Sequence, residues 1–193
     1  MEYCNMVDVK SFDCFPTAIS QFSLEINHEP IIEIVNLPSD LPDQLFRERN
    51  FKPLVNGILE ATTKVLYKQQ YQYDKIEITN MWANKLNSGE SHPPHTHSNN
   101  FLSGVYYLKA GKTAPIQFFD PRPAANVLQP RNTPNWHNSS MIQFDSIEGS
   151  GYIFPSWLQH WVPPTKEYRI SVSWNILLRG NYGRQGTLQN AHI

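Results

Sequence analysis

The chain has 193 residues, of which 17% are charged and 12% aromatic, and its formal net charge is −1. This near-neutral balance argues against a dedicated nucleic-acid binder, which usually carries a basic excess. No run approaches the roughly 18 apolar residues of a membrane helix, and residues 1–10 lack the apolar core of a signal peptide. The composition indicates a cytoplasmic globular protein with no membrane partner, forming one domain over residues 1–193.

The chain begins with an extended lead-in over residues 1–30, in which residues 14–26 alternate apolar and polar side chains well enough for a strand. Two cysteines, Cys4 and Cys14, fall within this lead-in. Because no export signal precedes them, we expect reduced thiols rather than a disulfide.

Two helices are predicted next. The first covers residues 37–50, where Ser39 and Asp40 stand at positions that favour helix N-caps. The second covers residues 54–73 and contains no proline. Its apolar side chains fall roughly on one face: Leu54, Ile58, Val65 and Leu66. We therefore expect residues 1–74 to form a strand and helices.

The pattern changes after residue 74. Short β-rich runs alternate with clusters of proline, glycine and asparagine, which is typical of a sandwich, barrel or jelly roll. These runs are 75–86, 101–108, 115–120, 141–146, 151–157, 160–164 and 168–178. The sequence predicts a β core over residues 75–179 and a polar, loosely held tail over residues 180–193.

Three of the seven histidines lie between positions 92 and 97. If the segment around His95 and His97 is extended, both imidazoles lie on one face, about 7 Å apart along the strand, and can share a metal ion. On its own such a pair is a weak signal. His92 falls outside this alternation and precedes two prolines, so we expect it in a loop at the rim. The remaining unpartnered histidines are expected on the surface: His28, His137 and His192.

The last β-rich run has one wholly polar face. Arg169, Ser171, Ser173 and Asn175 alternate with apolar residues. A polar face within a β core indicates a lined site, and a buried arginine there requires an anion. An internal salt bridge or a surface strand would explain the same pattern.

Together, the histidine pair, a third histidine at position 160 and an Arg-x-Ser pattern at 169–171 resemble the Fe(II)/2-oxoglutarate-dependent dioxygenases. More closely, the chain looks like a family of 2OG-Fe(II) oxygenases found in bacterial and phage genomes. The matching segments are "FPT" (15–17), "WAN" (82–84), "PHTH" (94–97), "SGVYYL" (103–108), "FPSWLQHWVPP" (154–164) and "RISVSWN" (169–175). The resemblance implies a mainly β fold, a double-stranded β-helix (a cupin-like jelly roll) with N-terminal helices packed on it.

The resemblance also implies roles for individual residues. The metal-binding and catalytic residues would be His95, His97 and His160. The cofactor-binding residues would be Arg169 and Ser171 at the distal carboxylate of 2-oxoglutarate, Tyr107 beside them, and Asn84 and Asn175 in the pocket. Fe(II), 2-oxoglutarate and dioxygen would be consumed in hydroxylating a small molecule or a protein side chain, with release of succinate and carbon dioxide. A homodimer is a further expectation.

One departure leaves the metal open. His97 stands where most of the superfamily has a carboxylate. Three imidazoles also suit zinc, or the three-histidine iron of thiol dioxygenases. Alternatively, Glu90 or Asp120 supplies a carboxylate in place of His97.

Two other functions compete with the oxygenase. One is a cupin-type metalloprotein that does not use 2-oxoglutarate, because Gly89 and the later histidine pair fit the opening of the first cupin motif. The glutamate that this motif requires after the second histidine is missing. The other is a jelly-roll binding module with a structural metal and no catalytic activity.

Overall fold

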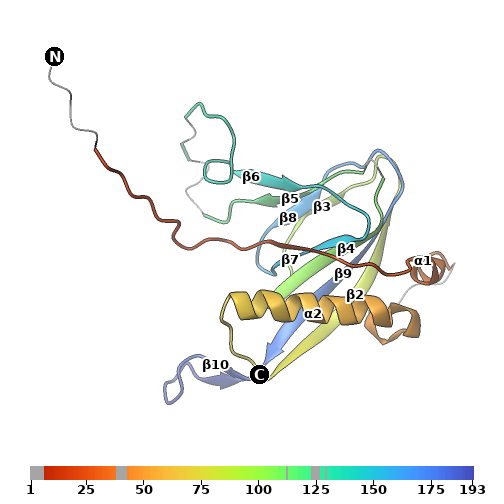
Figure 1. The fold of residues 1–193 in the computed structure, drawn as a ribbon, viewed down its shortest axis with the longest axis horizontal. Helices are drawn as coiled ribbons and strands as arrows, with labels where there is room; N and C mark the ends of the chain where they lie inside the picture. Colours follow the sequence, from red (N-terminus) through yellow and green to blue (C-terminus); the bar gives the residue numbers. More distant parts are fainter. Residues whose placement is uncertain (1–6, 38–42, 112, 123–126, 129) are drawn as a thin grey trace.

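The computed structural model describes residues 7–37, 43–111, 113–122, 127–128 and 130–193. Cys4 and the predicted N-caps Ser39 and Asp40 lie outside these residues, whereas Cys14 is exposed and unbonded. Two antiparallel sheets form the core, and helices cover the outer face of the larger sheet (Figure 1).

The larger sheet has five strands in the order β1-β7-β4-β9-β2, and the smaller has four in the order β3-β8-β5-β6. From β2 onward the chain passes repeatedly from one sheet to the other, which is the connectivity of a double-stranded β-helix. The predicted jelly-roll fold is therefore confirmed. The strands are β1 (Ser20–Ser23), β2 (Lys75–Leu86), β3 (His92–His95), β4 (Leu102–Lys109), β5 (Ile116–Phe119), β6 (Met141–Phe144), β7 (Ser150–Pro155), β8 (His160–Val162) and β9 (Arg169–Arg179).

One face of β9 packs into the hydrophobic core, and the other faces the space between the sheets. Val172 and Trp174 are fully buried in the core beneath the helices. A side chain at Gly104 on the neighbouring strand β4 would overlap the Trp174 indole, so only glycine fits there. The alternating residues Arg169 and Ser171 instead face the space between the sheets.

Helix α2 (Lys52–Lys68) confirms the stronger of the two helix predictions, with ends that differ by a few residues. Pro53 occupies the first turn, where a missing N–H is harmless. The buried side chains repeat every four residues and lie on one face: Leu54, Ile58, Thr62 and Leu66. None of the helices in the described ranges is long and apolar enough to cross a membrane.

The prediction of a helix over residues 37–50 was wrong for the described part of that segment. Two 3-10 turns replace it, η1 (Leu45–Arg47) and η2 (Arg49–Phe51), separated by Glu48 in an extended conformation. The backbone N–H of Met81 donates a hydrogen bond to Asp43 O at 2.8 Å, which ties this segment to β2. Tertiary contacts thus override the helix-forming composition.

The lead-in contains the expected strand as β1. A short helix that was not predicted, α1 (Glu29–Val35), begins where the lead-in ends, because seven residues rich in isoleucine give no clear helical pattern. The other end of the chain also differs from its prediction. The polar tail forms a small hairpin of β10 (Asn181–Tyr182) and β11 (Ala191–His192). The Tyr182 hydroxyl anchors it by donating to Leu178 O at 2.6 Å.

Candidate metal centre

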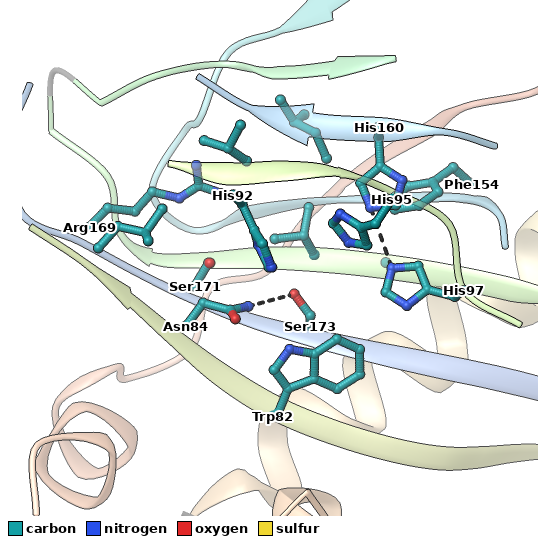
Figure 2. Close-up of a pocket in the computed structure, with 15 residues that line it drawn as sticks. Trp82, Asn84, His92, His95, His97, Phe154, His160, Arg169, Ser171 and Ser173 are labelled. Carbon is teal, nitrogen blue, oxygen red and sulfur yellow. Dashed lines mark hydrogen bonds between the residues drawn. The ribbon is translucent and has the colours of Figure 1, made fainter. Parts of the chain in front are cut away.

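His95, His97 and His160 converge between the two sheets (Figure 2). One ring nitrogen of each lies within 4.8 Å of the corresponding nitrogens of the others. His95 on β3 pairs directly with His160 on β8, and His97 lies two residues beyond the end of β3. The predicted pair and the remote third histidine are therefore brought together.

Backbone carbonyls set the orientation of two of these rings. Nδ1 of His95 lies 2.8 Å from Pro93 O, and Nδ1 of His160 lies 2.9 Å from Leu158 O. A carbonyl only accepts, so each Nδ1 carries the proton and each Nε2 keeps a free electron pair. Nε2 of His160 lies 3.4 Å from Nε2 of His97. This is the arrangement that a metal ligand set requires.

Burial keeps the imidazoles of His97 and His160 neutral. It lowers the pKa of His160 to about 3, with neighbouring histidines adding to the effect and the Leu158 carbonyl opposing it. Burial also lowers the pKa of His97 to about 4, again reinforced by the neighbouring histidines. The neutral imidazole is the form that binds a metal ion, so at neutral pH no proton has to be displaced from either ring.

Neither candidate carboxylate joins the group. Glu90 Oε2 accepts a hydrogen bond from the backbone N–H of Asn87 at 2.7 Å. Asp120 accepts from the backbone and the guanidinium of Arg122, with 2.6 Å between Nη2 and Oδ2, and so closes the turn that follows β5. The geometry favours His97 over either carboxylate as the third ligand.

Arg169 is a buried cation for which the described residues provide no anion. Only 2% of the residue is exposed, its Nε has no hydrogen-bond partner among the described residues, and its Nη1 donates one long bond of 3.5 Å to Ala114 O. No carboxylate within the described residues forms an ion pair with it. Burial lowers the pKa of Arg169, and Tyr107 opposes this decrease. The guanidinium nevertheless remains charged at neutral pH. Such a group requires an anion from outside the chain.

Tyr107 lies beside this guanidinium. It is completely buried, its hydroxyl has no well-formed hydrogen bond, and Cζ of Arg169 lies 4.9 Å from its ring centroid. Burial raises the pKa of Tyr107, and Arg169 and Ser146 oppose that rise. The hydroxyl is therefore protonated and able to donate. On the adjacent strand, Ser171 pairs with Tyr107 and is 2% exposed.

The two predicted asparagines lie in different places. Asn84 lines the pocket and donates from Nδ2 to Ser173 Oγ at 3.0 Å. Asn175 does not line this pocket. Its Oδ1 accepts from Ser103 Oγ at 2.6 Å and its Nδ2 donates to Asn80 Oδ1 at 2.8 Å, so its amide is used within the protein.

His92 lines the pocket from a strand, whereas a loop at the rim was predicted for it. It begins β3 and pairs with Val162, while His95 pairs with His160, so β3 has one residue more than β8 between the two pairs. This bulge contains Pro93 and Pro94, which have no N–H for the ladder. It turns His92 to the same inward face as His95, where strict alternation would point it outward.

A second histidine also differs from its prediction. His28 was expected on the surface without a partner. It is half-buried, and its Nε2 lies 2.9 Å from the hydroxyl of the buried Tyr106.

Comparisons with known proteins extend these observations. A family model described as "Putative 2OG-Fe(II) oxygenase" matches residues 80–175, which include the three converging histidines and Arg169. No curated protein sequence is significantly similar to this chain.

The fold is similar to that of solved structures. A prolyl-4-hydroxylase from Pseudomonas putida superposes with a TM-score of 0.57 and 12% identity, over 87% of this chain and 89% of that one. A viral collagen prolyl hydroxylase from Paramecium Bursaria Chlorella virus-1, solved with 2OG, gives 0.52 and 13%, over 82% and 94%. At such low identity the likeness shows a shared fold.

Proposed function

Because this chain belongs to the 2OG-Fe(II) oxygenase family, we propose that His95, His97 and His160 hold one Fe(II) ion and that Arg169 holds 2-oxoglutarate beside it. The family uses Fe(II), 2-oxoglutarate and dioxygen. When bound, these supply the oxidising chemistry: one oxygen atom enters a substrate C–H bond and the other enters succinate as 2-oxoglutarate loses carbon dioxide. The proposed activity of this chain is hydroxylation.

The ligand set suits this chemistry. Three histidine ligands would leave coordination positions open for a chelating cosubstrate and dioxygen. Three neutral imidazoles do not offset the charge of Fe(II), so the protein provides no counter-charge at the metal. A dianion such as 2-oxoglutarate offsets it. The all-histidine set therefore favours binding of a doubly negative cosubstrate.

The observation that carries the proposal is the unpaired guanidinium of Arg169 beside three converging histidines. A guanidinium binds a carboxylate through two parallel hydrogen bonds, and Nε of Arg169 is free to make one of them. The buried Ser171 hydroxyl is a further donor that lines the pocket with Arg169, and Tyr107, which lies against the guanidinium, does not line the pocket. A cupin-type centre or a structural zinc site gives no reason for this second group of donors.

We propose a small molecule or a protein side chain as the substrate. Two solved structures of similar fold are named as prolyl hydroxylases, so a peptidyl proline is the first substrate to test. Succinate formed from 2-oxoglutarate, in amounts matching the hydroxylated product, is the expected signal for a true substrate.

An air-free titration tests the cofactor assignment. Adding 2-oxoglutarate to the Fe(II)-loaded protein should produce a weak visible charge-transfer band, which His160→Ala should abolish and Arg169→Ala should weaken. His137→Ala is the matched control, since this side chain is 75% exposed and outside the metal centre. Metal binding without any response to 2-oxoglutarate would instead support the cupin-type or structural-metal alternative.

A further inference from the structure

The pocket between the metal centre and Arg169 is narrow. Its free volume is about 30 Å³, and it opens to solvent. A five-carbon dicarboxylate that reaches from the metal to Arg169 would have to pass through this narrow space. A side chain that lies on this path must therefore move when the ligand binds.

His92 occupies the position that such a ligand needs. Figure 2 shows its ring between the guanidinium of Arg169 and the ring of His95. The ring centroids of His92 and His95 are 4.7 Å apart. Burial lowers the pKa of His92, and the charges of His95 and Arg169 lower it further, which agrees with a position between the two groups.

The His92 ring is less restrained than the rings of His95 and His160. Within the described ranges its ring makes no hydrogen bond, whereas His95 and His160 are each held by a backbone carbonyl and Asn84 is held by Ser173. The residue is half-buried and starts a strand whose next two residues are prolines. Rotation about its side-chain bonds therefore breaks no hydrogen bond with these residues and opens the pocket toward solvent.

We propose that the His92 imidazole is a movable wall of the cosubstrate pocket, which must rotate away before a dicarboxylate bridges the metal and Arg169. This inference rests on the proposed function. Because the open position is disfavoured in the ligand-free protein, His92 weakens the apparent affinity for 2-oxoglutarate.

Two substitutions at this position distinguish the effect of the ring's size from the effect of its nitrogens. In air-free titrations of the Fe(II)-loaded protein, followed by the visible band and by calorimetry, His92→Ala should bind 2-oxoglutarate about two- to tenfold more tightly than the wild type. His92→Phe keeps a ring without nitrogens and should bind no more tightly than the wild type. Weaker or unchanged binding by His92→Ala would overturn the proposal, since the ring would then be a direct contact or irrelevant.

A measurement on the wild-type protein tests the proposal even if the variants misfold. Modification of His92 by diethyl pyrocarbonate, located by mass spectrometry, should become faster when 2-oxoglutarate is added to the metal-loaded wild type. Slower modification would mean that the ligand covers the ring, contrary to the proposal. If neither the wild type nor His92→Ala responds to 2-oxoglutarate, the proposed function fails and this inference fails with it. If only His92→Ala responds, both are supported.

Discussion

The guanidinium of Arg169 lies against the ring of Tyr107, with 4.9 Å between Cζ and the ring centroid. Within the described residues Arg169 Nε has no hydrogen-bond partner and the Tyr107 hydroxyl no well-formed one, although both residues are almost completely buried. Buried polar groups without partners destabilise a fold. Replacing either residue by an apolar one should therefore stabilise the ligand-free protein and, at the same time, lower its affinity for 2-oxoglutarate.

Replacing Arg169 by methionine should stabilise the metal-free protein and weaken cosubstrate binding. Exchange of a buried charge for an apolar side chain of similar length raises stability by about 1–4 kcal/mol in favourable cases. Loss of a two-bond contact to a carboxylate should weaken 2-oxoglutarate binding by a factor on the order of 100. Urea unfolding and the air-free titration measure the two effects. A large loss of stability would show that Arg169 has a structural partner after all.

Tyr107→Phe should separate stability and binding in the same way. Removing an unsatisfied hydroxyl should leave the free energy of unfolding unchanged or raise it by about 1 kcal/mol, while 2-oxoglutarate affinity falls about fivefold. Tyr106→Phe is the matched control on the same strand, because the Tyr106 hydroxyl lies 2.9 Å from His28 Nε2. This control should lose about 1 kcal/mol of stability without a change in affinity. Similar behaviour of the two variants would argue against a binding role for Tyr107.

Local patterns were sufficient to predict the β core and most of the pocket. The predicted strand 75–86 has the same bounds as β2, because alternation and the flanking turn residues define a strand within a few neighbouring positions. The polar face of β9 was equally visible, since a period of two places Arg169, Ser171 and Ser173 on one side.

What escaped prediction depends on register and on distant contacts. His92 faces the pocket because of a bulge against β8, and a bulge is a property of a strand pair that one strand does not reveal. By alternation along β9, Asn175 was expected on the same face as Arg169. Its amide is instead bound by Ser103 and Asn80, which belong to two other strands. The segment 43–51 bends into 3-10 turns because Leu45 and Phe51 are both buried.

Asn175→Ala should destabilise the protein and weaken metal binding, although Asn175 is not one of the proposed metal ligands. The amide of Asn175 joins Ser103 to Asn80, and Ser103 Oγ lies 2.8 Å from Ser156 Oγ. The carbonyl of Ser156 accepts the backbone N–H of His97 at 2.9 Å. The network therefore positions a proposed ligand.

The expected loss of stability for Asn175→Ala is about 1–3 kcal/mol, because the substitution leaves buried polar groups unpaired. Urea unfolding and Fe(II) titration measure it. Asn56→Ala, at an exposed position of α2, is the control and should raise stability by a few tenths of a kcal/mol, about the helix-propensity gain of alanine. Unchanged metal affinity in Asn175→Ala would show that the network stabilises the fold without positioning His97.

The metal-free protein should lose stability in acid through its buried histidines. Burial lowers the pKa of His160 to about 3 and that of His97 to about 4, whereas an imidazole in the unfolded chain titrates near about 6.5. Above about pH 6.5 both states are neutral and these groups add no pH dependence. Below it the unfolded chain takes up protons first, so stability falls as the pH falls toward the folded values.

Each of these histidines should contribute up to about 1.4 kcal/mol of lost stability per pH unit in this window. Urea unfolding of the metal-free protein between about pH 6.5 and about pH 5 isolates the effect, because most carboxylates are still ionised there. His160→Gln removes one titrating group and should make the decline with falling pH less steep. Equal slopes for wild type and His160→Gln would mean that His160 is protonated as easily in the folded protein as in the unfolded chain.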